Sequence, residues 1–356
     1  MIRVLIVDDS ALMRKKLSDI LNADSEIEVV GTARDGEDGV LKARELRPDV
    51  VTMDINMPGM DGLTSLQYII NEGICPVLMV SSLTQEGALA TFEALELGAF
   101  DFIPKPGGTI SINLDAVKKE LISKIKYAAK AGSLEKIKKY RERKRKWNET
   151  KIHTPPTKNN DIISKAVVIG VSTGGPKILS DIIADLPADL GAVVFIVQHI
   201  PPNFTASFAD RLNKIANFTI KEAEGGEVLK NNTGYLGKGG YHLLINRLTP
   251  SVVPRIRLST RPEHLFMPSV DIMMESVLNI FKERTVGVLL TGMGDDGANS
   301  MVKIKKAGGI TIAESEETAV VYGMPAEAVA RGGVDILVPG YKVANEIVKA
   351  LKKIPD

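Results

Sequence analysis

The sequence has 356 residues, a formal net charge of +1 and a single cysteine, Cys75. The balanced charge argues against a general attraction to nucleic acid or to a membrane surface, and one cysteine excludes an intramolecular disulfide. No apolar run approaches the roughly 20 residues that a membrane-spanning helix needs, and the length suits about two domains. We therefore predict a cytoplasmic protein with no nucleic-acid partner and no membrane insertion.

Residues 1–125 alternate short apolar runs with amphipathic helical segments, for example over Ala11–Leu21 and Gly39–Leu46. Five βα units predict an α/β domain of the flavodoxin-like (βα)5 type, with a doubly wound parallel sheet and a site at the carboxyl ends of its strands. The predicted strands are Val4–Val7, Glu28–Gly31, Val50–Met53, Val77–Val80 and Phe100–Ile103.

Polar residues follow the predicted strands of this domain, and they are Asp8, Asp9, Asp54, Ser81 and Lys105. Carboxylates gathered at one sheet edge repel each other unless a divalent cation or a lysine neutralises them. Such a cluster suits Mg²⁺ and phosphoryl transfer with an aspartate as nucleophile. Alternatively, Asp8 and Asp9 only cap the next helix and Asp54 only begins a turn.

Three segments of this domain resemble a two-component receiver domain, and they are Val7–Ser10, Met53–Gly62 and Pro104–Pro106. The resemblance implies that Asp54 accepts a phosphoryl group from a chemotaxis histidine kinase. It implies that Mg²⁺ is held by Asp8, Asp9, Asp54 and the carbonyl group of Asn56. It also implies that Ser81 and Lys105 contact the phosphoryl oxygens and that Phe102 is the switch aromatic residue.

Residues 126–163 form a predicted linker. Its segment Leu134–Lys151 is dominated by lysine and arginine, and the prolines and polar residues of Thr154–Asp161 break any helix. The segment is either a mobile tether or an interaction arm for an acidic partner.

Residues 164–356 open with an apolar strand over Ala166–Ile169 and predict a second doubly wound α/β domain. The stretch 227–259 has glycine-rich turns and alternating residues, which predict antiparallel strands or a hairpin beside the main sheet. We expect a mixed, mostly parallel sheet. Further strands are predicted over Ala192–Val197, Val286–Leu290, Ile310–Ala313 and Asp335–Val338, and helices over Ala298–Ala307, Pro325–Arg331 and Val343–Leu351.

The glycine-rich loop Gly170–Pro176 places Ser172 between a buried strand and a helix. The helix N-terminus offers unpaired N–H groups to a developing negative charge, which suits a nucleophile. The same geometry suits a bound phosphate, so the loop alone does not distinguish a nucleophilic serine from a phosphate-binding site.

Two further loops at strand ends carry His199 and the pair Asp295 and Asp296. A histidine can take the proton of a serine hydroxyl, and a carboxylate can orient the imidazole. His242 and His264 are alternatives, but the first lies in a strand region where packing is expected and the second in a surface-like segment. The chain order Ser–His–Asp differs from the Ser–Asp–His order of α/β-hydrolases, although Gly170–Gly174 fits their G-x-S-x-G pattern.

Five segments of this domain resemble the chemotaxis methylesterases, and they are Ser172–Pro176, Gln198–Pro202, Pro268–Asp271, Leu290–Gly297 and Val321–Pro325. With the receiver domain in front, the whole chain is similar to the CheB family of protein-glutamate methylesterases/glutaminases. This implies hydrolysis of glutamate methyl esters, and deamidation of glutamines, on chemoreceptors.

The family's motif Gly-Met-Gly-x-Asp-Gly implies Asp296 as the third member of a Ser172–His199 triad, with Asp295 as its variable neighbour. We expect the oxyanion to be held by backbone N–H groups of Thr173 and Met293, with no cofactor in the catalytic domain. We also expect the receiver and linker to cover the Ser172 cleft until Asp54 is phosphorylated. Rival functions are a DNA-binding response regulator and a nucleotide-binding dehydrogenase. The second domain shows neither a helix-turn-helix nor a winged domain, and the Ser172 loop lacks the G-x-G-x-x-G fingerprint with a downstream acidic ribose ligand.

Overall fold

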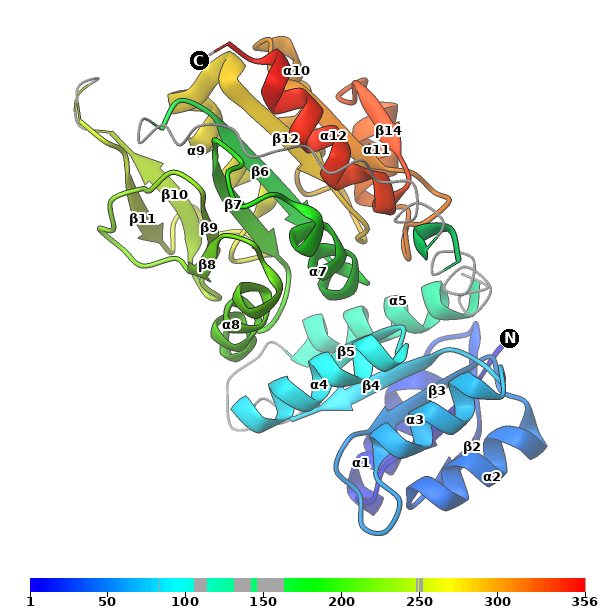
Figure 1. Ribbon diagram of the computed structural model, residues 1–356. Helices are drawn as coiled ribbons and strands as arrows, with labels where there is room; N and C mark the ends of the chain where they lie inside the picture. The colour runs from blue at the N-terminus through cyan, green and yellow to red at the C-terminus, as the bar shows by residue number, and fades with distance from the viewer. Residues whose placement is uncertain are drawn as a thin grey trace. The chain divides into compact units, whose positions relative to one another are not determined.

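A computed structural model gives the structure of the chain, and it describes residues 1–82, 84–105, 114–130, 142–145, 163–247, 249 and 252–355. The chain divides into two compact units, Met1–Lys139 and Tyr140–Asp356 (Figure 1). No helix in the described part of the chain combines the length and apolar character that a membrane span requires.

The first unit has a five-stranded parallel sheet in the order β2-β1-β3-β4-β5. Helices α2, α3 and α4 pack side by side, and α5 packs against β3, β4 and β5. The predicted (βα)5 receiver fold is confirmed. Its elements are β1 (Ile2–Val7), α1 (Ala11–Asn22), β2 (Ile27–Ala33), α2 (Gly36–Leu46), β3 (Val50–Asp54), α3 (Gly62–Asn71), β4 (Val77–Ser81), α4 (Gln85–Leu97), β5 (Asp101–Pro104) and α5 (Leu114–Lys130).

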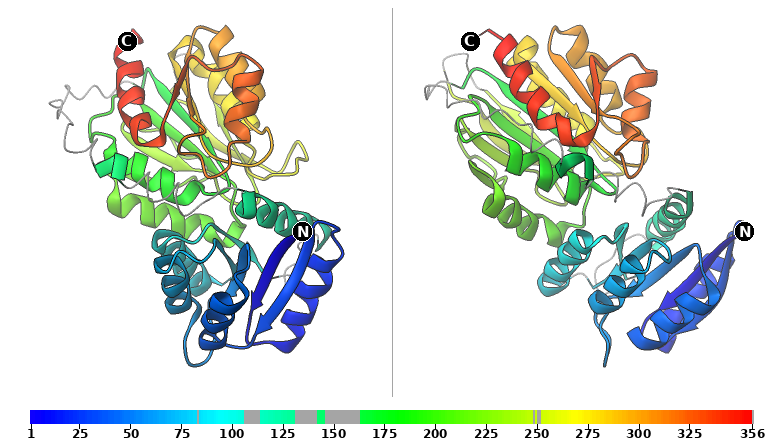
Figure 2. Two further views of the ribbon diagram at one scale, coloured as in Figure 1. Left: turned by 90° about the vertical axis from the view of Figure 1, so that its right-hand side faces the viewer. Right: turned by 45° about the vertical axis from the view of Figure 1, so that its right-hand side comes forward.

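The second unit has a seven-stranded sheet in the order β14-β13-β12-β6-β7-β9-β8. Helices α7 and α12 contact each other, and α10 packs between α9 and α11 (Figure 2). Its elements are β6 (Ala166–Val171), α7 (Gly175–Asp185), β7 (Val193–Gln198), η1 (Pro202–Phe204), α8 (Thr205–Ile215), β8 (Thr219–Glu222), β9 (Thr233–Leu236), β10 (His242–Asn246), β11 (Arg255–Ser259), α9 (Val270–Phe281), η2 (Lys282–Arg284), β12 (Thr285–Leu289), α10 (Ala298–Lys306), β13 (Ile310–Glu314), α11 (Met324–Ala330), β14 (Ile336–Val338) and α12 (Gly340–Lys353).

The α/β class of the second unit is confirmed, with one difference in detail. Every pair of neighbouring strands in its seven-stranded sheet is parallel, and the antiparallel strands β10 and β11 form a separate two-stranded sheet. The sequence pattern did not predict β8, and it predicted antiparallel strands in the stretch 227–259, which contains β9. Both strands instead extend the parallel sheet beyond β7. Their four-residue length gives too little periodicity to distinguish them from loops.

The central strands β6, β7 and β12 of this unit are buried along their whole length. Both faces of a parallel sheet are covered by helices, so its strands are continuously apolar rather than alternating. Their carboxyl ends meet at one edge, where the loops that follow them carry the polar residues of the candidate site.

Only residues 142–145 of the predicted basic segment 134–151 lie within the described part of the chain, and they are helical. Arg143 forms an ion pair with Glu317, and Lys144 forms one with Asp181. The boundaries of the linker at 126 and 163 stay a prediction.

Candidate functional site

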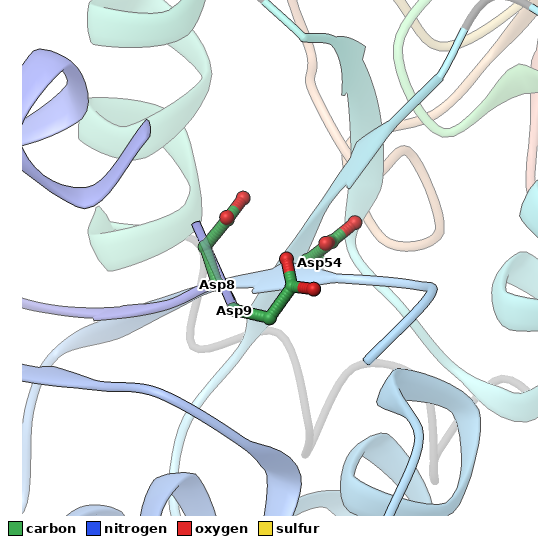
Figure 3. A group of neighbouring side chains, drawn as sticks. All are labelled: Asp8, Asp9 and Asp54. Carbon is green, nitrogen blue, oxygen red and sulfur yellow. The ribbon is translucent and has the colours of Figure 1, made fainter. Parts of the chain in front are cut away.

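Three carboxylates gather at the carboxyl edge of the sheet in the first unit (Figure 3). Asp8 and Asp9 directly follow β1, and Asp54 is the last residue of β3. One oxygen from each of the three lies within 4.8 Å of the others. Asp8 and Asp54 are buried, whereas Asp9 is exposed.

None of the three carboxylates is a helix N-cap, although Asp8 Oδ1 accepts from the Ser10 N–H at 2.9 Å just before α1. The N-cap of α1 is Ser10, whose hydroxyl accepts a hydrogen bond from the Met13 N–H at 3.3 Å. The N-cap of α3 is Asp61, which accepts from the Thr64 N–H at 2.7 Å. N-capping therefore does not explain why these three carboxylates gather at one edge of the sheet.

Lys105 supplies the positive charge of this cluster. Its Nζ lies 2.7 Å from Asp54 Oδ2 and 3.3 Å from Asp8 Oδ2. Burial raises the pKa of Asp54, and the negative charges of Asp8 and Asp9 add to this effect against the opposing contact with Lys105. Burial alone would lower the pKa of Lys105, but its contacts with Asp54 and Asp8 raise it.

The donor set fits a divalent cation. Three carboxylates face Lys105, and the buried Asp8 Oδ2 accepts no hydrogen bond from the described residues and has only the 3.3 Å ion pair with Lys105. Hard oxygen ligands of this kind are those that Mg²⁺ prefers. Asn56 lies exposed in the loop after β3, two residues beyond Asp54.

Ser81 ends β4, and its hydroxyl bonds to α4 rather than to the carboxylates. It accepts from the Thr91 hydroxyl at 2.7 Å and lies 3.4 Å from the Gly87 carbonyl oxygen. Phe102, in β5, is buried, and the ammonium group of Lys124 lies 5.5 Å from its ring centroid.

The Ser172 loop of the second unit joins β6 to α7. Gly174 caps the helix at φ +75°, a left-handed conformation that glycine adopts without strain. Thr291, which follows β12 after Leu290, holds the loop from one side. Its carbonyl oxygen accepts from the Ser172 N–H at 2.9 Å, and its hydroxyl donates to the Thr173 carbonyl oxygen at 2.9 Å.

His199 follows the next strand of the sheet, and the register places it beside Ser172. Val171 of β6 pairs with Gln198 of β7, so the two residues that follow them lie at neighbouring strand ends. The His199 Nε2 atom lies 2.9 Å from Asp296 Oδ2. Its Nδ1 atom is buried and has no hydrogen-bond partner among the described residues. One imidazole nitrogen is thus occupied by a carboxylate and the other is free to act as a base.

Asp296 is fixed by the start of α9. Its Oδ1 accepts from the Ser269 hydroxyl at 2.8 Å and from the Asp271 N–H at 2.9 Å, and its Oδ2 accepts from the Val270 N–H at 2.7 Å. Burial would raise the pKa of Asp296, but the bond from His199 and the backbone N–H groups of α9 lower it to about 2. The carboxylate therefore stays ionised beside the imidazole.

Asp295 contacts Arg331 and not His199. The sequence offers both Asp295 and Asp296 as the carboxylate that orients the histidine. The Oδ2 atom of Asp295 lies 2.6 Å from Nη2 of Arg331, which also contacts Glu327 and Asn299. Of the two neighbouring aspartates, Asp296 is the one that contacts His199.

The backbone N–H groups of Thr173 and Met293 donate to no acceptor among the described residues. Thr173 is buried, and Met293 lies two residues beyond Thr291. Both N–H groups are thus available to a ligand, as an oxyanion hole requires.

His242 and His264, the two alternatives to His199, have other contacts. His242 is buried, its Nδ1 accepts from the Ser269 N–H at 3.2 Å, and its Nε2 bonds the Pro262 carbonyl oxygen at 2.9 Å. Burial lowers the pKa of His242, which favours the neutral ring that this pairing requires. His264 is exposed.

Phe266 stacks on the His199 ring, with the ring centroids 4.1 Å apart.

Sequence reasoning missed two parts of this site. Helix α9 was not predicted, although the apolar spacing of Met273, Met274, Val277 and Phe281 could have indicated it. Glu314, at the end of β13, was also missed. It is buried, has no cationic partner among the described residues, and accepts from the Thr291 N–H at 2.9 Å and the Thr318 hydroxyl at 2.8 Å. Burial raises the pKa of Glu314 to about 7.

Two family models match the chain. The model of the CheB methylesterase matches residues 167–347, and that of the response regulator receiver domain matches residues 4–114.

Several similar proteins align with nearly the whole chain. A protein-glutamate methylesterase/protein-glutamine glutaminase 3 of Syntrophomonas wolfei is 55% identical over 356 residues, which cover 99% of this chain and 100% of that protein. The protein-glutamate methylesterase/protein-glutamine glutaminase of Pyrococcus horikoshii is 46% identical over 358 residues, covering 99% of this chain and 94% of that protein. The crystal structure of the Thermotoga maritima CheB methylesterase catalytic domain is similar with 39% identity and a TM-score of 0.51, covering 53% of this chain and 99% of that chain.

Proposed function

The chain belongs to the family of protein-glutamate methylesterases/protein-glutamine glutaminases that carry a receiver domain, and we propose that Ser172, His199 and Asp296 are its catalytic triad. The observation that carries this proposal is the 2.9 Å contact between His199 and Asp296 beside the Ser172 loop. A DNA-binding output domain and a dehydrogenase, the two rival functions, lose their support because the methylesterase family model covers residues 167–347.

In the proposed reaction, Nδ1 of His199 takes the proton of the Ser172 hydroxyl as its oxygen attacks the ester carbonyl of a glutamate γ-methyl ester. Asp296 bonds the opposite ring nitrogen, so it fixes the tautomer and stabilises the imidazolium that forms. The imidazolium then returns the proton to the leaving methoxide, and methanol departs. Water, deprotonated by the same histidine, hydrolyses the acyl-enzyme to free glutamate and Ser172.

The tetrahedral intermediate carries a negative charge on the former carbonyl oxygen. We assign its stabilisation to the N–H groups of Thr173 and Met293, which have no other acceptor among the described residues. A glutamine amide follows the same route, with ammonia as the leaving group.

We propose chemoreceptors as the substrate and a chemotaxis histidine kinase as the phosphodonor. Asp54 accepts the phosphoryl group, because it is the carboxylate that both ends a strand and contacts Lys105. Asp8, Asp9, Asp54 and the Asn56 carbonyl group would hold Mg²⁺, which when bound neutralises charge on the transferred phosphoryl group.

Phosphorylation is proposed to activate the esterase. Lys105 and Ser81 can both contact the phosphoryl oxygens, but Ser81 must first leave its hydrogen bonds to Thr91 and Gly87 of α4. Recruitment of Ser81 thus changes the contacts of α4, and Phe102 repacks with it.

The test of the proposed function is methanol release from a methylated chemoreceptor in isolated membranes. Wild-type protein is expected to release methanol and Ser172→Ala to release none, with unchanged circular dichroism as the control for folding. Methanol release by a folded Ser172→Ala protein at the wild-type rate would refute the assignment.

A further inference from the structure

Gln198 joins the two strand ends that carry the proposed nucleophile and base. It is the last residue of β7, and its side chain is buried at 1% exposure. Its Nε2 donates to the Ser172 carbonyl oxygen at 2.9 Å and to the His199 carbonyl oxygen at 3.2 Å. One carboxamide therefore contacts the backbone of both catalytic residues without touching the reacting atoms.

The carbonyl group of Ser172 and the N–H group of Thr173 belong to the same peptide bond. In a trans peptide these two groups point in opposite directions. The carbonyl oxygen is held by Gln198 and by the Gly175 N–H at 2.8 Å, so the Thr173 N–H is directed away from both donors. If this peptide flipped, a carbonyl oxygen would replace the N–H and repel an oxyanion.

The fit around the carboxamide is close. A Cβ atom at position 175 would lie 2.2 Å from Gln198 Oε1, so the glycine at this position leaves the space that Gln198 occupies. The Oε1 atom is buried and has no hydrogen-bond partner among the described residues. Such an unpaired buried acceptor costs stability, so the residue is not explained by stability alone.

We infer that Gln198 is a positioning residue that holds the Ser172–Thr173 peptide in the orientation that directs the Thr173 N–H toward the oxyanion. The inference rests on the proposed function, because it assigns a support to the proposed oxyanion donor. A donor is required at this position. A thioether or an alkyl side chain of similar size offers none.

The test compares Gln198→Met and Gln198→Leu with wild-type protein in methanol release from a methylated chemoreceptor in isolated membranes. Loss of one oxyanion donor costs roughly 10²- to 10³-fold in kcat, and the Gly175 N–H still holds the peptide in part. We therefore expect kcat to fall by about 10- to 100-fold with little change in KM, since the oxyanion exists only in the transition state.

Asn217→Leu is the matched control. The Asn217 Nδ2 likewise donates to two backbone carbonyl oxygens, those of Ala184 at 3.2 Å and Leu186 at 2.8 Å. These carbonyl groups lie at the C-terminal end of α7, whereas the Ser172 loop precedes its N-terminal end. We expect kcat in this variant to stay within about twofold of wild type, because a hydrogen bond remote from the reacting atoms is not part of the transition-state contacts.

Thermal unfolding shows which variants are folded, and Gln198→Leu carries the test if Gln198→Met does not fold. A folded Gln198 variant with wild-type kcat, or an equal loss of kcat in Asn217→Leu, overturns the inference. If Ser172→Ala is inactive while a folded Gln198 variant keeps wild-type kcat, this inference alone fails. If Ser172→Ala is active, both the proposed function and this inference fail.

Discussion

Asp295 forms an ion pair with Arg331, with 2.6 Å between Oδ2 and Nη2, and this contact separates it from its neighbour Asp296. The side chain of Asp295 is 59% exposed, whereas that of Asp296 is 4% exposed and bonded to His199. Two adjacent aspartates thus have different surroundings, which gives them different expected roles.

The first prediction compares Asp296→Asn with Asp295→Asn in methanol release. Asp296→Asn should lower kcat by on the order of 10³-fold or more, because an amide favours the wrong imidazole tautomer and stabilises the imidazolium less. Asp295→Asn should leave kcat within about twofold and change the free energy of unfolding by at most about 1 kcal/mol, as for an exposed ion pair. The opposite ranking would move the triad to Asp295.

The second prediction concerns the independence of the two proposed sites. Ser172→Ala should abolish methanol release while Asp54 incorporates phosphate from an acyl phosphate at the wild-type rate, because the two residues lie in different units. Phosphate incorporation is measured with a radiolabelled donor, and Asp54→Ala is the blank. A loss of phosphorylation in Ser172→Ala would contradict the separate roles.

The third prediction concerns the proposed Mg²⁺ site. Asp9→Asn should weaken Mg²⁺-dependent phosphorylation of Asp54, because it removes an exposed carboxylate from the acidic group. The rate is measured over a Mg²⁺ titration, and the midpoint should shift to higher concentration. Asp19→Asn, which removes an exposed carboxylate from α1, is the matched control and should leave the midpoint unchanged. Equal midpoints in the two variants would remove Asp9 from the site.

The fourth prediction concerns Glu314, whose pKa is raised from 4.5 to about 7 by burial. The folded protein binds this proton more tightly than the unfolded chain does. The stability from this group is therefore fully present below about pH 4.5 and declines as the pH rises toward about 7.

Glu314→Gln removes this decline and keeps an acceptor for the Thr291 N–H. Relative to wild type, the variant should gain stability between about pH 5 and about pH 8, by on the order of 3 kcal/mol at most. Thermal unfolding midpoints at the two pH values measure the difference. Parallel pH dependences in the two proteins would show that the Glu314 pKa is not raised.

The sequence predicted the strand-end residues of both sites because parallel strands bring their carboxyl ends to one edge of a sheet. Ser172 and His199 follow β6 and β7 directly, so their proximity follows from the strand register alone. The fold class was predictable for the same reason, since apolar strands alternate with amphipathic helices along most of the chain.

The supports of the site could not be predicted in this way. Ser269 and the first turn of α9 bind Asp296 across about 26 positions of sequence, and no periodicity encodes such a contact. Glu314 resembles an ordinary charged residue at a strand end until its burial and its neutral hydrogen-bond donors are known. These contacts depend on how helices pack on the sheet, which local sequence patterns do not determine.

The most direct test of the account is methanol release from a methylated chemoreceptor, measured with and without an acyl phosphate. Wild-type protein should be activated severalfold by the phosphodonor. Asp54→Ala should keep the unactivated rate under both conditions, and Ser172→Ala should release no methanol under either. Equal rates in wild type with and without the donor would contradict control by Asp54, and methanol release by Ser172→Ala would contradict the central claim that Ser172 is the nucleophile.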